Sequence, residues 1–139
     1  GYELKRVRAN YCTVSHGHFD HDNVEGVDAI EVIRASHPKF LAIDSYHDAS
    51  LGALRGKNTI FKFELDGIRF CHLGDLGEFF SQDLVDEIGE VDVLFIPVGG
   101  TYTIDYKEAV KWYKLSAEHT DLHGDYHSYN ACGYCCAYI

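Results

Sequence analysis

The chain has 139 residues, of which 46% are hydrophobic and 24% are charged, and its formal net charge at pH 7 is −10. This length suits one domain, because it allows a buried core but is short for two. The negative charge argues against nucleic acid or an anionic membrane as a partner, since phosphate groups repel an acidic surface. No apolar run is long enough to span a bilayer, and the first residues lack the apolar stretch of a signal peptide, so we expect a cytoplasmic protein.

The first predicted element is a short strand at 11–14, and the loop after it contains the most informative motif. That motif is His16-Gly17-His18-Phe19-Asp20-His21, which places three imidazoles and a carboxylate close together. These groups are typical ligands of divalent metal ions. In an extended loop His16 and His18 lie on the same side and can bind one cation, while Asp20 and His21 reach toward a second. The alternative is a polar turn with solvated histidines, and the density of ligands favours the metal site.

Residues 22–36 are predicted to form a helix, because apolar residues that would share one buried face recur every three positions. These residues are Val24, Val27, Ile30 and Ile33. Pro38 would end the helix. A buried strand is expected at 40–43, and it leads into a polar segment with His47. Because catalytic groups in α/β folds gather at strand ends, His47 is a candidate metal ligand.

A β-hairpin is predicted between Thr59 and Leu73. Strands at 60–65 and 68–73 flank Asp66-Gly67, a pair that suits a type I′ turn. The second strand runs into Gly74-Asp75-Leu76-Gly77, so Asp75 is a further candidate ligand at a strand end, with a plain turn aspartate as the alternative. His72, inside that strand, is interpreted as a packed residue or as one that orients a ligand by a hydrogen bond.

Two more helices and a strand complete the predicted elements. Ser81 would cap a short helix that ends at Gly89. A buried strand follows at 91–98. Asp105 and Glu108 form a capping-box pair that would open a helix through about Leu115. Strands alternate with helices, which favours an α/β fold with some antiparallel pairing.

The character of the chain changes after Leu115. We therefore divide it into a domain at 1–115, which contains the candidate metal ligands, and a tail at 116–139 that is rich in His, Tyr and Cys. Cys132 and Cys135 would form a separate zinc site or a redox pair, but without a second paired motif an incidental tail is preferred. We interpret the change as the mark of a fragment, or of an end out of frame with the beginning.

Three stretches, at 13–23, 55–59 and 99–105, resemble a known family when they are taken together with the later His47 and the Gly-Asp at a strand end. Over residues 1 to about 115 the chain resembles the metallo-β-lactamase superfamily of metal-dependent hydrolases. Within it, the chain is similar to the ascorbate-6-phosphate lactonase-like branch. The resemblance implies a four-layer αββα sandwich, which would be incomplete here because the first strands of the family are missing.

The resemblance also implies a set of metal ligands. His16, His18 and His47 would hold the first metal, Asp20 and His21 would hold the second, and Asp75 would bridge both. Asp20 and Asp75 would be catalytic, with Asp20 orienting the nucleophile or accepting its proton. A metal-activated hydroxide would cleave an ester, lactone or phosphoester bond. One or two Zn²⁺ ions per chain are expected, with Mn²⁺ as the alternative.

The expected partner is a small, anionic substrate molecule. Arg55 and Lys57 form a basic cluster that could contact it, and the alternative for this cluster is a solvated loop. A homo-oligomer stays open. Two other functions are alternatives: a non-catalytic metal-binding fragment of such a hydrolase, and a nuclease of the same superfamily. The net charge and the lack of a basic, aromatic-lined stripe argue against the nuclease.

Overall fold

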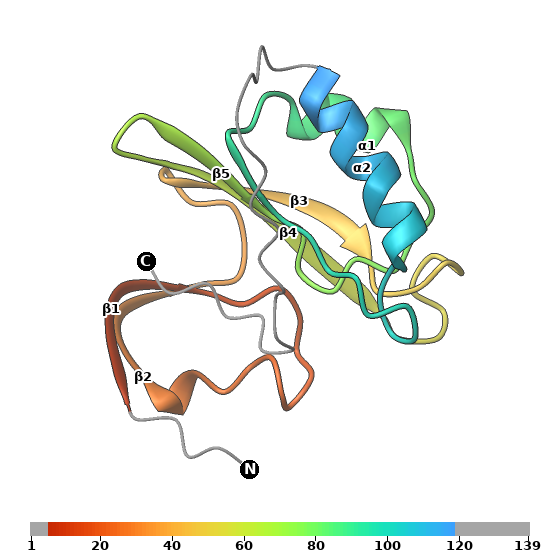
Figure 1. Cartoon of the computed structure of the whole chain (residues 1–139). Coiled ribbons are helices and arrows are strands. Elements are labelled where there is room, and N and C mark those ends of the chain that lie inside the picture. The colour runs from red at the N-terminus through yellow and green to blue at the C-terminus, as the bar shows by residue number, and fades with distance from the viewer. Residues whose placement is uncertain (1–5, 119–139) are drawn as a thin grey trace.

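The computed structural model describes residues 6–118, drawn in colour in Figure 1. In this part of the chain the elements are β1 (Val7–Thr13), a 3₁₀ turn η1 (Val24–Gly26), β2 (Val27–Ile33), β3 (Phe40–Tyr46), β4 (Lys57–Leu65), β5 (Ile68–His72), α1 (Gln82–Ile88), β6 (Val93–Phe95) and α2 (Tyr106–Glu118). No described helix has the length and apolar content that crossing a bilayer requires.

The strands form two sheets that lie on top of each other. β1 and β2 pair in parallel, and the second sheet has the order β3-β4-β5-β6, antiparallel except for the parallel β5–β6 pair. Figure 1 shows α1 and α2 on one side of the four-stranded sheet and the two-stranded sheet on the other. This layering confirms the predicted α/β fold. It is a partial sandwich, because no α-helix of residues 6–118 covers the outer face of the two-stranded sheet.

The alternation of side chains along β4 explains how its sheet supports a layer on each side, because successive residues of a strand point to opposite faces. Ile60 belongs to the core between the sheet and the helices, together with Trp112 of α2. Phe61 and Phe63 belong to a second apolar cluster with Ile33 of β2. Trp112 is 1% exposed, so almost all of the large apolar area of its side chain is removed from water.

The predicted hairpin and the two helices predicted after it are confirmed, but Ser81, at the N-cap of α1, makes no side-chain capping hydrogen bond. Asp66 and Gly67 have φ values of 54° and 80°, as a type I′ turn requires. α1 ends at Gly89, whose φ is 60° and whose N–H donates to Val85 O at 2.8 Å. At the start of α2, Asp105 Oδ1 accepts hydrogen bonds from the N–H groups of residues 107 and 108, each at 2.9 Å. The helix extends to Glu118, beyond the predicted end.

The helix predicted at 22–36 is wrong, because most of this segment forms β2. Its valines and isoleucines are β-branched and favour strands. In a strand, a spacing of three residues places side chains on opposite faces. Val27 is accordingly 8% exposed and Ile30 is 83% exposed, while Ile33, six residues after Val27, is 4% exposed. The three-residue spacing therefore combines buried residues on the inner face of β2, such as Val27 and Ile33, with an exposed apolar residue on its outer face, Ile30. It does not mark one face of a helix.

The strand predicted at 91–98 is much shorter than expected. β6 includes only Val93–Phe95, and the chain then leaves the sheet close to Pro97. Proline has no N–H for a strand ladder, which explains why the pairing stops there. The predicted tail at 116–139, with its histidines and cysteines, lies almost wholly outside the described residues, and its interpretation stays a prediction.

Candidate metal centre

The motif loop connects two parallel strands and is held between the two sheets. Val14 N–H donates to Ile33 O at 2.9 Å, and Ser15 O accepts a hydrogen bond from Thr59 N at 2.8 Å. A turn then brings the chain back, since the N–H groups of His21 and Asp22 both donate to His18 O at 2.9 Å. His16 and His21 are thereby buried, at 9% and 6% exposure.

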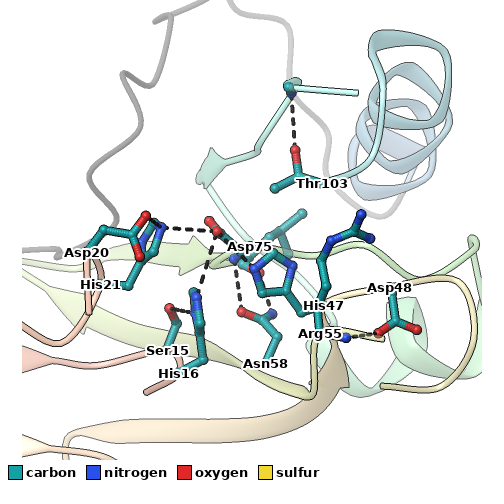
Figure 2. Close-up of polar contacts among 12 residues, drawn as sticks. Ser15, His16, Asp20, His21, His47, Asp48, Arg55, Asn58, Asp75 and Thr103 are labelled. Carbon is teal, nitrogen blue, oxygen red and sulfur yellow. Dashed lines mark hydrogen bonds and ion pairs between the residues drawn. The ribbon is translucent and has the colours of Figure 1, made fainter. Parts of the chain in front are cut away.

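Two more candidate ligands come from the four-stranded sheet. His47 follows the end of β3 and Asp75 lies in the loop after β5, and they are 2% and 8% exposed. Asp75 Oδ2 lies 3.2 Å from His21 Nε2, 3.3 Å from His47 Nε2 and 3.8 Å from His16 Nε2. Figure 2 shows these three imidazoles arranged around the Asp75 carboxylate. One oxygen atom therefore faces ring nitrogens from two separate loops.

The candidate ligands form two overlapping groups, in each of which the ligand atoms lie within 4.8 Å of one another. One group is His16, His18 and His47, and the other is His16, His21 and Asp75. The first matches the residues that the family resemblance implies for the first metal. The second group contains His16, whereas the resemblance implies Asp20 together with His21 and Asp75. The roles of all these residues as ligands stay predictions.

Asp20 lies at the edge of this cluster. Its Oδ2 is 3.5 Å from His21 Nε2, and its side chain is 45% exposed. It does not belong to either group of closely spaced ligand atoms. The carboxylate is therefore near the second group, but it would have to turn inward to bind a cation held by His21 and Asp75.

The electrostatics of the site suit a cation. Burial and the imidazoles of His21, His47 and His18 lower the pKa of His16 to about 4, although Asp75 opposes the shift. At neutral pH His16 is therefore uncharged. Its Nδ1 lies 3.0 Å from the Ser15 hydroxyl, and a hydrogen bond from Nδ1–H to this oxygen leaves the Nε2 lone pair free.

Two buried ring nitrogens strengthen this argument. His16 Nε2 and His47 Nδ1 have no hydrogen-bond partner among residues 6–118. Burying a polar atom without a hydrogen-bond partner lowers the stability of the fold. Packing several imidazoles against one another around a single carboxylate lowers it as well. Binding a divalent cation would satisfy such nitrogens and balance the carboxylate. The residues present fit a metal ion.

Asn58 holds the site together, although sequence reasoning did not assign it a role. Its Oδ1 accepts a hydrogen bond from Asp75 N at 2.9 Å (Figure 2). Its Nδ2 donates to Ser45 Oγ at 2.7 Å and to Leu73 O at 2.9 Å. The side chain is thus fully used, and the residue is 1% exposed. Its one signal in the sequence is its place in the 55–59 stretch that carries the family resemblance.

Two glycines allow the ligand loops to approach each other. A Cβ on Gly74, whose φ is 59°, would lie 2.4 Å from Asn58 Oδ1. A Cβ on Gly77 would lie 2.4 Å from the backbone oxygen of His47. Gly77 N–H also donates to Tyr46 O at 2.9 Å. The loop with Asp75 therefore rests on the backbone that holds His47.

The loop after His47 is organised by a buried carboxylate. Asp48 is 2% exposed and accepts four backbone hydrogen bonds, from the N–H groups of residues 50, 52, 54 and 55 at 2.7–3.1 Å. Burial alone would raise the pKa of Asp48, but these four donors outweigh it and lower the pKa. This role cannot be read from the sequence, because it depends on the closed loop.

A cleft of about 470 Å³ opens beside the candidate ligands. One wall contains Asp20, His21 and Asp75, and the other is formed by the segment after β6. Tyr102 belongs to that second wall, and the Arg55 guanidinium lies over its ring at 5.2 Å from the centroid. A substrate in this cleft would contact the candidate metal ligands directly.

His72 also lines this cleft, between the two walls. Burial lowers its pKa to about 4, Asp75 opposes the shift and His21 adds to it. Its Nδ1 accepts a hydrogen bond from Gly74 N at 3.0 Å, and its ring packs against Phe95 at a centroid distance of 5.6 Å. His72 is thus partly packed, as predicted, but its hydrogen bond goes to a backbone N–H and not to a candidate ligand.

Several relatives have known sequences or structures. A metal-dependent hydrolase of the UPF0173 group from Carboxydothermus hydrogenoformans is 30% identical, over 78% of this chain and 63% of its own length. One from Archaeoglobus fulgidus is 26% identical, over 80% of this chain and 63% of its own length. The chain thus spans less than two thirds of these curated relatives.

A solved structure agrees with the sequence relatives. It is a Thermotoga maritima protein assigned as a Zn-dependent hydrolase of the metallo-β-lactamase superfamily. It is 37% identical, with a TM-score of 0.64, and the match covers 81% of this chain and 56% of that one. In addition, residues 1–116 match the sequence profile of the β-lactamase superfamily domain. The chain therefore belongs to the β-lactamase superfamily.

Proposed function

We propose that the chain contains the metal centre of a metal-dependent hydrolase that cleaves an ester, lactone or phosphoester bond in a small anionic substrate. The main support is the position of Asp75 Oδ2, which lies 3.2–3.8 Å from the Nε2 atoms of three histidines. The names of the relatives support metal dependence and hydrolysis. The bond type and the substrate class are our own inference.

Zn²⁺ is the metal that we propose. Imidazole nitrogens predominate among the candidate ligands, and they suit zinc, whereas the carboxylates of Asp20 and Asp75 would also accept Mn²⁺. When bound, such an ion lowers the pKa of a water molecule to about 7 and stabilises negative charge on the substrate. His16, His18 and His47 would hold one ion, and His21 and Asp75 would complete a second position.

Asp20 is the residue that we propose to handle the proton of the nucleophile. It lines the cleft, and its carboxylate is partly exposed, 3.5 Å from His21 Nε2. A carboxylate at the open side of a metal centre can accept a proton and pass it to solvent. This role agrees with its position outside the closely spaced ligand groups.

The anionic character of the substrate is supported by Arg55. Residues 6–118 provide no carboxylate partner for its guanidinium, whereas Arg34 and Arg69 are paired with carboxylates. Arg55 instead stacks on Tyr102, a wall of the cleft, which leaves its N–H donors free for a carboxylate or phosphate group.

The experiment measures metal content and turnover in the same preparations. The chain is loaded with Zn²⁺ or Mn²⁺, its metal is counted by elemental analysis, and it is assayed with 4-nitrophenyl acetate, a simple lactone, and mono- and diesters of 4-nitrophenyl phosphate. We expect one or two ions per chain and metal-dependent cleavage of at least one substrate. A single bound ion with no cleavage would contradict the hydrolase and favour the non-catalytic metal-binding fragment.

Two aspartates provide a matched pair for this test. Asp75→Ala removes the carboxylate between the histidines, and we expect it to lower the bound metal by about one ion per chain and to abolish cleavage. Asp44→Ala removes the same charge from an exposed position of β3 and should change neither. Unchanged stoichiometry in Asp75→Ala would refute the bridging role.

The substrate class is tested by a second matched pair. Arg55→Gln should raise KM about tenfold for an anionic ester such as mono-4-nitrophenyl succinate, and leave KM for neutral 4-nitrophenyl acetate within twofold. Lys39→Gln removes another cation that stacks on a tyrosine, Tyr11, at 4.9 Å from the ring centroid, and should affect neither ester. Equal effects of Arg55→Gln on both esters would contradict the proposed substrate class.

A further inference from the structure

His72 differs from the candidate ligand histidines in its hydrogen-bond geometry. It is the last residue of β5, and its Cα pairs with Phe61 on one side and Phe95 on the other. It lines the same cleft as Asp20, His21 and Asp75. It does not belong to either group of closely spaced ligand atoms. A histidine in this position has contact with the cleft but no assigned role.

The protonation of the His72 ring follows from its backbone contact. Gly74 N–H donates to His72 Nδ1 at 3.0 Å, so Nδ1 must offer a lone pair. An imidazole whose Nδ1 accepts a hydrogen bond is neutral and has its proton on Nε2, because the charged ring has protons on both nitrogens. The Gly74 contact therefore makes His72 a donor at Nε2.

This donor has no acceptor within residues 6–118, where the ring makes its one hydrogen bond through Nδ1. His16 has the opposite arrangement. Its Nδ1 lies against the Ser15 hydroxyl, and its Nε2 faces Asp75. Ser15 allows His16 to use Nε2 as a lone pair for a metal ion, whereas Gly74 prevents this for His72. The two residues are thus suited to different tasks in one site.

We propose that His72 is a catalytic residue whose Nε2–H donates a hydrogen bond to the substrate oxygen that gains negative charge during hydrolysis. The proton stays on Nε2 throughout, so the residue stabilises charge and does not transfer a proton. A neutral imidazole can act as an electrophile of this kind. Removing one such preorganised donor typically lowers kcat by about 10²–10³-fold. The kinetic part of this inference rests on the proposed function.

The first test measures the tautomer and does not require turnover. In metal-free protein labelled with ¹⁵N-histidine, NMR at pH 7 should show His72 with its proton on Nε2 and a lone pair on Nδ1. Inorganic phosphate, added to the zinc-loaded protein as a probe for the reacting group, should shift the His72 Nε2–H resonance. A proton on Nδ1, or no response of His72 to phosphate that binds at the centre, would overturn the proposal.

The second test separates the donor from the structural contact with two amide side chains. His72→Asn places an acceptor near the Nδ1 position, which retains the bond from Gly74 and deletes the cleft donor. His72→Gln places an amide N–H near the Nε2 position. We expect His72→Asn to lower kcat about 100-fold at unchanged metal content and unchanged KM, and His72→Gln to recover at least tenfold of this loss.

The pH profile gives a readout that a merely structural role would not produce. Because the donor keeps its proton, the kcat–pH curve of His72→Asn should fall in height and retain its shape. If His72→Asn retains kcat within twofold of the wild type, the proposal is wrong. If the wild type itself shows no turnover, the proposed function fails. In that case two measurements without turnover would still test the role of His72. Its proton should be on Nε2, and phosphate should bind at least threefold more weakly to His72→Asn than to His72→Gln.

Discussion

The two sheets both supply residues to the candidate site, but they are packed to different extents. The four-stranded sheet has apolar clusters on both faces, one of them beneath α1 and α2, and it supplies His47 and Asp75. The two-stranded sheet is packed on one face only, and residues such as Ile30 are exposed on the other. The loop that it supports places Phe19, at 92% exposure, between candidate ligands.

This difference suggests how the site is built. The ligands from the four-stranded sheet are buried and held by Asn58, Gly74 and Gly77, so their geometry is set before any ion binds. His18 and Asp20, from the motif loop, are exposed and have room to adjust. A buried set of ligands and a more exposed set would allow two cation positions of different affinity. Four changes would test this comparison.

The largest effect is expected in the core beneath the helices. Trp112→Ala should destabilise the chain by about 3–5 kcal/mol, because it leaves a large cavity at a position that is 1% exposed. Urea unfolding measures the loss. Val110→Ala on the same helix, at 46% exposure, is the control and should cost less than about 1 kcal/mol. Similar losses for both variants would show that α2 does not pack as described.

A smaller effect is expected at the centre of the ligand loops. Asn58→Ala leaves the buried Asp75 N–H without its acceptor, which should cost about 1–3 kcal/mol of stability. Because Asn58 positions a candidate ligand, metal affinity should also fall about 10–100-fold. Chelator competition measures the affinity. Gln82→Ala, which removes an exposed amide that bonds to Asp86, should leave the affinity unchanged.

An acid-dependent effect is expected at the edge of the four-stranded sheet. Hydrogen bonds from Arg69 lower the pKa of Asp92 to about 2, below its value in the unfolded chain. A carboxyl whose pKa is lower in the folded state stabilises the fold above its unfolded pKa, and this contribution is lost as the pH falls from about 4 to 2. The stability difference between the wild type and Asp92→Asn should therefore shrink over this range. Urea unfolding measures this difference. If it stays constant from pH 4 to pH 2, the pairing of Asp92 with Arg69 does not stabilise the fold as described.

The smallest effect on stability is expected in the motif loop. Phe19→Ala should change stability by less than about 0.5 kcal/mol, because the side chain is 92% exposed and loses almost no buried contact. Metal content should stay the same. Thermal unfolding and elemental analysis measure both quantities. A large loss would mean that Phe19 is covered by another part of the protein, and the loop would then be less free than proposed.

The fold could be predicted where local patterns and burial agree. Apolar runs identified β3, β4 and β5, and Asp66-Gly67 identified their hairpin. The segment at 22–36 failed because apolar residues on both faces of a half-exposed strand imitate the spacing of a helix. Ile30 shows this most clearly, since an isoleucine at 83% exposure contradicts the usual link between hydrophobicity and burial.

The sequence could predict only those residues of the candidate site whose types and spacing are typical of metal ligands. Four histidines and two aspartates, in the motif and at two strand ends, suggested one centre, and the structure brings most of them together. Asn58 and Asp48 could not be found in this way, because an amide or a carboxylate has no special meaning until its distant hydrogen-bond partners are known. The role inferred for His72 likewise depends on one backbone contact with Gly74.

The contact between Gly77 and the backbone of His47 has a consequence for engineering. Loops near such centres are attractive targets for exchange between homologues, because they border the substrate. Here a graft that replaces Gly77 by another residue would be unsafe, since a Cβ at position 77 would collide with the backbone oxygen of residue 47 at 2.4 Å. A transplanted Asp75 loop should therefore keep glycine at position 77, and a chimera with a larger residue there should misassemble.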